Sequence, residues 1–168
     1  MRVYIALGSN LGNREEYLRA GVRGLSERQV DITGTASVYS TAPRDVLDQP
    51  RFLNTAIEAD TTLSPQELLA ACLDIEKNNN RVRDAAIGTR SINKGPRTLD
   101  IDIIFYGTEI IRTPDLTIPH PRFALRRFVL VPVAEIAPNF VDPVSGKTIA
   151  ELLAHCPDEG EVLLAGAL

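Results

Sequence analysis

Residues 95–107, which read GPRTLDIDIIFYG, are the stretch from which the predicted fold is built outward. Apolar and β-branched residues run between Gly95 and Gly107, a pattern that predicts a buried strand. Asp100 and Asp102 interrupt that run. Because side chains alternate along a strand, both carboxylates project from one face, with Cα atoms roughly 6.6 Å apart. The apolar residues beside them take the opposite face, toward a core.

The aspartate pair predicts a metal site. Two like charges on an apolar strand are costly unless a positive charge lies between them. Oxygen ligands with no nearby histidine or cysteine favour Mg²⁺, which one or two carboxylates usually hold beside a nucleotide phosphate. Arg97, three residues before Asp100, adds a guanidinium group suited to phosphate oxygens. The alternative is an edge strand whose polar face is simply hydrated; the adjoining Gly-Pro-Arg and the arginines upstream argue against it.

The pattern Lys94-x-x-Arg97-x-x-Asp100-Ile101-Asp102-Ile103-Ile104, with Gly95-Pro96 inside it, resembles the signature of the 6-hydroxymethyl-7,8-dihydropterin pyrophosphokinase family of folate synthesis. The resemblance extends from Tyr4 to about Pro138. It implies an ATP-dependent diphosphotransferase that moves pyrophosphate from ATP to the pterin hydroxymethyl group and releases AMP. Mg²⁺ is implied as the cofactor, with two ions on the aspartates.

The same resemblance implies a set of site residues. The catalytic set is Arg81, Arg97, Asp100 and Asp102, with Asp100 and Asp102 as metal ligands; the nucleotide set is Glu76, Arg83, Arg97, Ile103, Thr117, His120 and Arg126; the pterin set is Thr41, Ala42, Arg44, Phe52, Asn54 and Phe128. Ala42 and Arg44 are expected to act mainly through their backbone. Asp102 is also a candidate acceptor for the hydroxyl proton, unless a bound metal makes a base unnecessary.

Composition limits the classes of function. A chain of 168 residues with 44% hydrophobic content predicts one domain over residues 1–168. A net charge of −4 argues against a nucleic-acid partner. The segment from Lys77 to Arg97 carries six basic residues and one acidic residue, which suits a small polyanion. No signal peptide or membrane-length apolar run is evident, so we expect a cytoplasmic protein with no membrane partner and no obligate protein partner.

The element pattern predicts an α+β fold: an antiparallel, ferredoxin-like sheet flanked by helices. Strands are expected at residues 3–7, 30–39 and 52–61 in addition to the aspartate strand. Helices are expected from Asn13 to about Glu27 and from a cap at Ser64 to about Asn78. Beyond Pro138 the pattern predicts a turn, a short helix and a tail without chemistry.

Several site residues have two readings. The Gly8-Ser9-Asn10 cluster is either a plain turn or a phosphate-binding nest. Phe52 is either a core residue or the aromatic face on which a planar heterocycle stacks, with Asn54 at the edge of that ring. Glu76 opposes the dipole of its helix, so it is either a solvated glutamate or one with a cationic or nucleotide partner.

Two further groups are also open to two readings. His120, between prolines, is either structural or a phosphate contact. Arg81-Val82-Arg83 is either a solvated strand face or part of a phosphate clamp. The chain lacks the tryptophan that family members carry before Gly95, and Lys94 occupies that position. We expect residues 84–94 to act as a mobile lid.

Two rival functions use the same features. A nucleotidyltransferase also places an Asp-x-Asp on a strand, but its Gly-Ser pair lies about one helix away. Here Gly8-Ser9 precedes the aspartates by some ninety residues. An α+β ligand-sensing module leaves the paired aspartates and the basic segment unexplained.

Overall fold

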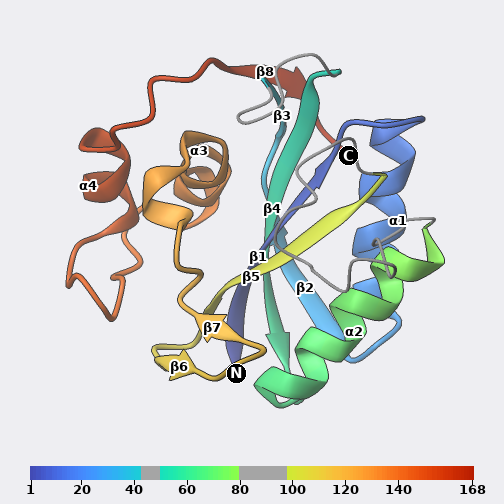
Figure 1. Cartoon of the computed structure of the whole chain (residues 1–168), viewed down its shortest axis with the longest axis horizontal. Coiled ribbons are helices and arrows are strands. Elements are labelled where there is room, and N and C mark those ends of the chain that lie inside the picture. The colour runs from blue at the N-terminus through green and yellow to red at the C-terminus, as the bar shows by residue number, and fades with distance from the viewer. Residues whose placement is uncertain (43–49, 80–97) are drawn as a thin grey trace.

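A computed structural model describes residues 1–42, 50–79 and 98–168, and within them an antiparallel sheet has helices on both faces (Figure 1). The elements are β1 (Arg2–Ser9), α1 (Arg14–Ser26), β2 (Val30–Thr35), β3 (Val38–Thr41), β4 (Phe52–Thr61), α2 (Pro65–Asn78), β5 (Asp100–Tyr106), β6 (Ile111–Arg112), β7 (Thr117–Ile118), a 3₁₀ turn η1 (Phe123–Leu125), α3 (Arg127–Ile136), α4 (Ile149–Ala154) and β8 (Val162–Gly166).

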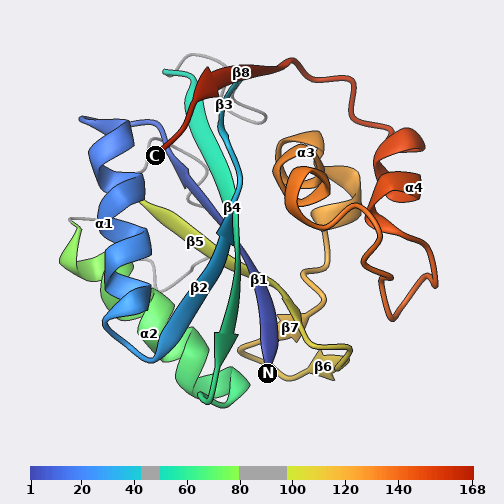
Figure 2. The same cartoon turned by 180° about the vertical axis from the view of Figure 1, so that it is seen from behind.

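The sheet has the strand order β5-β1-β4-β3-β8, and β2 also pairs with β4. All of these pairings are antiparallel. The order up to β3 is that of a ferredoxin-like β-α-β-β-α-β unit, so the predicted fold class is confirmed. Helices α1 and α2 cover one face, and α3 and α4 lie on the other (Figure 2).

The expected single strand over residues 30–39 is wrong: the structure has two strands, β2 and β3, on the same neighbour β4. The register against β4 shifts by one residue between Thr35, which pairs with Ile57, and Tyr39, which pairs with Asn54, although the Ala36 N–H still donates to the Ala56 carbonyl at 2.9 Å. The backbone N–H of Ser37 donates to a carboxylate oxygen of Glu135 on α3 at 2.8 Å. A side chain 98 residues away therefore holds the backbone of Ser37 against α3.

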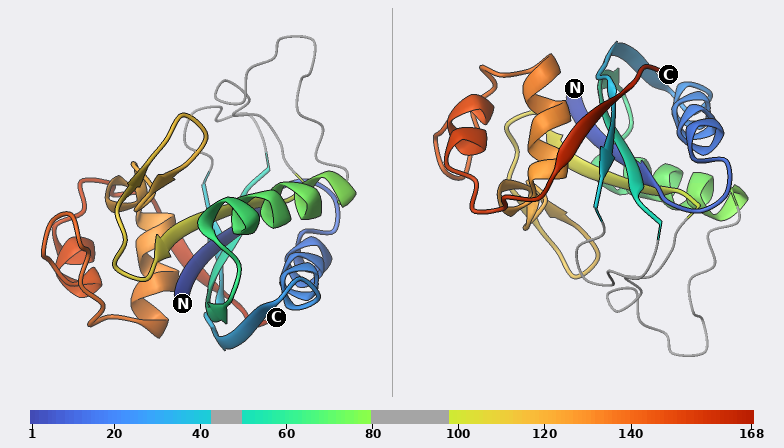
Figure 3. Two further views of the ribbon diagram at one scale, coloured as in Figure 1. Left: turned by 90° about the horizontal axis from the view of Figure 1, so that it is seen from below. Right: turned by 90° about the horizontal axis from the view of Figure 1, so that it is seen from above.

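The C-terminal tail contains a strand, β8, in addition to the turn and short helix predicted beyond Pro138. β8 pairs with β3 and extends the sheet at that edge (Figure 3). Most of β8 is exposed, so burial does not identify it as a strand in the sequence.

The predicted helix starts are confirmed. The Asn13 side chain accepts from the backbone N–H of Glu16 at the start of α1. At the start of α2, Ser64 and Glu67 form a reciprocal capping box with bonds of 3.2 and 2.9 Å. These caps satisfy backbone donors that the first helical turn leaves unpaired.

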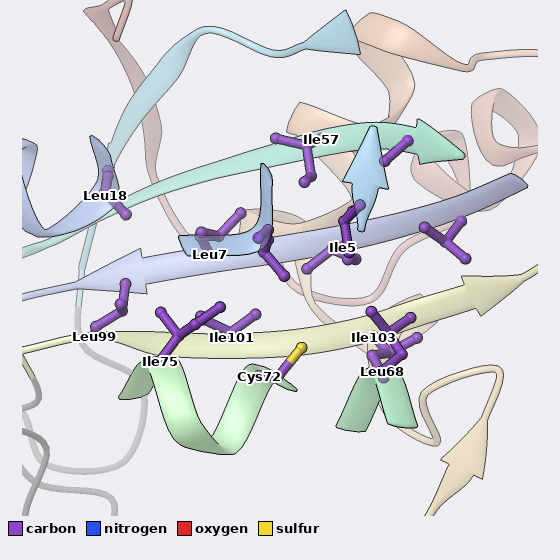
Figure 4. Close-up of a cluster of buried hydrophobic side chains, with 14 of the residues drawn as sticks. Ile5, Leu7, Leu18, Ile57, Leu68, Cys72, Ile75, Leu99, Ile101 and Ile103 are labelled. Atoms are coloured by element: carbon purple, nitrogen blue, oxygen red, sulfur yellow. The ribbon is translucent and has the colours of Figure 1, made fainter. Parts of the chain in front are cut away.

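A first hydrophobic core fills the space between the sheet and helices α1 and α2 (Figure 4). It takes alternate residues of the central strands and the inward stripe of the two helices. Its members include Ile5 and Leu7 of β1, Leu18 of α1, Leu68, Cys72 and Ile75 of α2, and Leu99, Ile101 and Ile103 beside the aspartates. The face expected for the apolar residues of the aspartate strand is therefore confirmed.

A second core lies under α3 on the other face of the sheet. An irregularity in the β1–β5 register adds a residue to this core. Ile5 pairs with Ile103, while the neighbouring residue of β1, Tyr4, pairs with Phe105. Ile104 is thus an extra residue on β5, and both Ile104 and Phe105 enter this core. A bulge of this kind places consecutive side chains on one face.

Phe105 is the centre of the second core. Its ring lies 4.9 Å from that of Phe123 and 4.6 Å from that of Phe140, and it is completely buried. We expect Phe105→Ala to lower the free energy of unfolding by roughly 3–5 kcal/mol, from lost burial and the cavity left behind. Urea denaturation measures this. The control Leu164→Ala, at a side chain 70% exposed, should change it by less than about 0.5 kcal/mol. Equal small effects would contradict the assignment of Phe105 to this core.

Candidate functional site

Asp100 and Asp102 lie on one face of β5, and both are partly exposed. Their backbone pairs with Gly8 and Ala6 of β1, respectively. This is the face that α3 covers farther along the sheet, because Ile104, two residues on, is buried in the second core. The expected arrangement of the two carboxylates on a single face away from the first core is confirmed.

The residues of β1 that pair with the aspartates are small. Gly8 pairs with Asp100 on one side and with Asn54 on the other. Ala6 pairs with Asp102 and with Ala56. Adjacent strands lie about 4.8 Å apart, so Asp100 and Asn54 are separated by roughly 10 Å with only a glycine between them. Only small residues therefore lie on this face between the aspartates and the polar side chain of Asn54.

Asn54 and Thr41 form the second polar group, and the aromatic Phe52 lies beside them. The amide Nδ2 of Asn54 donates to Oγ1 of Thr41 at 2.6 Å, and both residues are buried. Thr41 is the partner of Phe52 across β3 and β4. Phe52 is only partly buried and belongs to neither of the two core clusters described for this chain. Phe52 is therefore partly exposed on the strand that carries the hydrogen-bonded amide of Asn54.

Glu76 is not a solvated glutamate, because its residue is 2% exposed at the end of α2. Its Oε2 accepts from the backbone N–H of Ile101 at 2.8 Å. That amide lies between the two aspartates on the outer edge of the sheet. Burial, the Glu76 carboxylate and Asp102 together raise the pKa of the Cys72 thiol, so this cysteine is unreactive at neutral pH.

His120 contacts β5 from the loop after β7. Its backbone N–H donates to the carbonyl of Ile104 at 3.1 Å. Burial, then the positive charge of Arg126, lowers the pKa of His120 to about 4, while the carboxylate of Asp100 opposes the shift. The ring is therefore neutral at pH 7. Nδ1 accepts from the backbone N–H of Arg122 at 3.2 Å, which leaves the proton on Nε2 as a donor.

Arg126 and Phe128 lie together at the start of α3. The guanidinium carbon of Arg126 is 5.7 Å from the centre of the Phe128 ring, a cation–π contact. The electrostatic influence of both Arg126 and Asp100 on His120 shows that these charges converge on one histidine. The structure thus brings His120 and Arg126 toward the aspartates.

Other candidate residues are placed differently. The Ile103 side chain is 6% exposed in the first core, on the face opposite the aspartates. Because the Ile101 N–H points to the outer edge of β5, that of Ile103 points there too, so only its backbone is available to a ligand. Thr117 is partly buried and pairs with Arg112 in the β6–β7 hairpin. Ala42 is exposed at the end of β3.

The predictions for Arg44, Arg81, Arg83 and Arg97, and for a lid over residues 84–94, concern residues outside the described part of the structure. Asn79 and Thr98, which flank residues 80–97, are in contact. Thr98 Oγ1 donates to the carbonyl oxygen of Asn79 at 2.6 Å. The end of α2 therefore lies beside the residues directly before Asp100.

Sequence reasoning missed the role of Ala6 and Gly8. The Gly8-Ser9-Asn10 cluster is neither a turn nor a nest at its start, because Gly8 and Ser9 are paired residues of β1. Asn10 Nδ2 donates to the carbonyl of Pro50 and links β1 to the start of β4. The available signal was the alternation of small residues with large apolar ones along residues 5–8.

The donor set suits Mg²⁺. Within residues 1–42, 50–79 and 98–168, no three histidine, cysteine, aspartate or glutamate side chains are grouped to hold a metal ion. Proteins usually bind Mg²⁺ with one or two carboxylates, and phosphate and water supply the further ligands.

Within the described residues 1–42, 50–79 and 98–168, no helix is long and apolar enough to cross a membrane.

Known proteins resemble this chain in sequence. The family model for 7,8-dihydro-6-hydroxymethylpterin-pyrophosphokinase (HPPK) matches residues 4–138. The 2-amino-4-hydroxy-6-hydroxymethyldihydropteridine pyrophosphokinase of Pseudomonas aeruginosa is 40% identical over 167 residues, which cover 99% of this chain and 98% of that protein. The protein of the same name from Bacillus subtilis is 46% identical over 134 residues, 79% of this chain and 76% of that protein.

Longer proteins also match. The folic acid synthesis protein fol1 of Pneumocystis carinii is 41% identical over 156 residues, and the match spans 93% of this chain but 20% of that protein. Among solved structures, wild-type HPPK-DHPS of Plasmodium falciparum with pteroate has a TM-score of 0.71 at 15% identity. That match covers 91% of this chain and 42% of the other. At this identity it shows a shared fold.

The neutral state of His120 predicts a pH-dependent stability. The unfolded chain takes up a proton at His120 near pH 6.5, and the folded chain only near pH 4. Between these values the unfolded state binds more protons, so stability falls as the pH falls, by at most about 3 kcal/mol in total. Urea denaturation of metal-free protein between pH 7 and pH 4 measures this loss.

The chain has a matched control, since its only other histidine is the exposed His155. We expect His120→Gln to reduce the loss of stability between pH 6.5 and pH 4, and His155→Gln to leave it as in the wild type. An unchanged pH profile in His120→Gln would show that the folded protein binds the proton at an ordinary pKa.

Proposed function

The chain belongs to the HPPK family of folate-synthesis pyrophosphokinases, and on that premise we propose that it transfers pyrophosphate from ATP to the hydroxymethyl group of 6-hydroxymethyl-7,8-dihydropterin. One observation of the geometry carries the proposal. A partly exposed carboxylate pair and a fixed amide beside an aromatic ring share one sheet face, roughly 10 Å apart, with only Gly8 and Ala6 between them. This spacing accommodates a planar ring at one end and a metal-bound polyphosphate at the other.

At the pterin end, the chain would bind the ring by stacking and by edge contacts. Phe52 offers an open aromatic face, and Asn54 offers an amide whose orientation Thr41 holds. Phe128 would bound the ring from α3, and Ala42 and Arg44 would line the same pocket. This places the hydroxymethyl group toward the aspartates.

At the phosphate end, Asp100 and Asp102 would hold Mg²⁺, two ions in our proposal, which when bound neutralises the charge of the triphosphate. The hydroxyl oxygen would bond to the β-phosphorus as the bond from that phosphorus to the α-phosphate oxygen breaks, AMP would leave with that oxygen, and the hydroxyl proton would pass to Asp102 or to water. Arg81 and Arg97 would stabilise the charge on the transferred group, because such transfer depends mainly on positioning and charge.

The nucleotide would be held by groups around β5. His120 presents an Nε2 donor, and Arg126 a guanidinium, on the side of Asp100. Ile103 would contribute its edge backbone, while Glu76, Thr117 and Arg83 complete the proposed set. We further propose that residues 1–168 act as one cytoplasmic domain without an obligate protein partner.

The reaction is tested by its products. The protein is incubated with ATP, Mg²⁺ and 6-hydroxymethyl-7,8-dihydropterin, and the nucleotides are separated by chromatography. We expect AMP and the pterin diphosphate in equal amounts. Release of pyrophosphate would instead indicate a nucleotidyltransferase, and the absence of both products would favour a ligand-sensing module.

The role of the carboxylates is tested by Asp100→Ala and Asp102→Ala. We expect each variant to retain at most about a thousandth of the wild-type kcat at saturating Mg²⁺, the order seen when charge stabilisation is lost from such a site. The free energy of unfolding without metal should fall by less than about 1 kcal/mol, because neither side chain lies in a core and a like charge is removed. Steady-state kinetics and urea denaturation measure the two quantities.

Asp74→Ala is the control, because Asp74 is an exposed carboxylate of α2 that pairs with Arg28 at 2.9 Å. Its kcat should equal that of the wild type. Near-wild-type turnover in either Asp100→Ala or Asp102→Ala would remove the metal assignment.

A further inference from the structure

The backbone conformation at residue 8 does not require a glycine. It lies inside β1, paired with β4 on one side and β5 on the other. Its φ is not among the positive values found at four other glycines of the described chain. Alanine or a larger residue could adopt this backbone, and a glycine inside a strand normally weakens it. The reason for a glycine here must be space.

The space belongs to Asn54. A Cβ atom on Gly8 would lie 2.7 Å from Oδ1 of Asn54, a distance that Cβ atoms essentially never adopt. The other near atoms, at 3.7 Å, are Cγ of Asn54 and the carbonyl oxygen of Leu53. The added atom would therefore meet the amide of Asn54 before anything else on that face.

Asn54 cannot easily move away from such a contact. Its Nδ2 is bonded to Thr41 Oγ1 at 2.6 Å on the β3 side, and the residue is 7% exposed. Turning the amide would break that bond in a buried place, which is costly. The amide is thus held between Thr41 on one side and the bare backbone of Gly8 on the other.

We propose that Gly8 is a positioning residue of the pterin site, which by its missing side chain allows Asn54 Oδ1 to lie over β1 as a hydrogen-bond acceptor for the donor edge of the ring. The inference rests on the proposed function. The Gly8-Ser9-Asn10 cluster then serves the heterocycle and not the phosphates. Because Asn54 is the nearest group to the added atom and no atom of Asp100 is among the three nearest, the effect is confined to the pterin end.

The test uses Gly8→Ala, with Gly34→Ala as the matched control. Gly34 is also a strand glycine, but a Cβ there meets only Glu58, at 3.6 Å or more, an ordinary contact. Calorimetry measures the affinity for 6-hydroxymethylpterin in the presence of a non-hydrolysable ATP analogue with Mg²⁺, and separately the affinity for that analogue. We expect Gly8→Ala to weaken pterin binding about tenfold or more, as for the loss of one hydrogen bond, with analogue affinity within about twofold. Gly34→Ala should change neither.

The double variant Gly8→Ala with Asn54→Ala separates a role through Asn54 from a general one. If the glycine acts through the amide, adding Gly8→Ala to Asn54→Ala should change pterin affinity by less than about twofold, because the clashing group is gone. If Gly8→Ala alone does not fold, the double variant should fold, as judged by circular dichroism and urea denaturation.

The inference would be overturned by wild-type pterin affinity in Gly8→Ala, by an equal loss in the Asn54→Ala background, or by failure of the double variant to fold. Loss of analogue and pterin binding to the same degree would do so too. If the wild-type protein binds pterin and Gly8→Ala binds it equally well, this inference alone is removed. Wild-type protein that binds no pterin removes the proposed function.

Discussion

Asp100 and Asp102 lie on a strand of the central sheet without disrupting it because β5 alternates between two environments. Its odd-numbered residues up to Ile103 pack against α1 and α2 in the first core. The aspartates use the opposite face, where Ala6, the partner of Asp102, packs against the second core, and Gly8, the partner of Asp100, adds no side chain. The two-residue period that buries one set of side chains leaves the other set open. A single substitution of an aspartate therefore changes the site with little effect on the core.

The open edge of β5 is stabilised by α2. Edge strands carry unpaired backbone groups, and here the buried carboxylate of Glu76 accepts one of them, the N–H of Ile101. A hydrogen bond to a carboxylate is stronger than one between neutral groups. The contact connects the end of a helix to the amide between the two aspartates. The helix that packs beneath β5 thus also orients the strand segment that carries them.

Much of this could be predicted because the controlling interactions are local. The faces of residues 99–103 follow from alternation, and the caps at Asn13 and Ser64 follow from side chains within three residues of the helix start. The break at Ser37 could not be predicted, since it depends on Glu135 across the fold. The pairing of β8 depends likewise on a distant strand.

The role of the small residues between the aspartates and Asn54 lay beyond prediction for a different reason. A glycine in a sequence indicates conformational freedom or lack of volume, and only the register of β1 against β4 distinguishes the two. Once Gly8 is seen beside Asn54, lack of volume is the relevant property. The buried position of Glu76 is a similar case, because its helix position alone does not show that β5 lies against it.

Charge explains why the site combines a rigid face with the basic stretch of the sequence. On the described face, the carboxylate of Asp100 and the guanidinium of Arg126 both act on a neutral histidine, His120. Lys77 to Arg97 carries six of the basic residues of the chain and one acidic residue. Thr98 Oγ1 donates to the carbonyl of Asn79, so the end of α2 lies beside the residues directly before Asp100. In the proposed function the strands would supply metal ligands and ring contacts, and the basic residues of this stretch would supply most of the positive charge. A triphosphate with its metal requires both, because the carboxylates alone would repel the phosphates and the arginines alone would leave the metal without protein ligands.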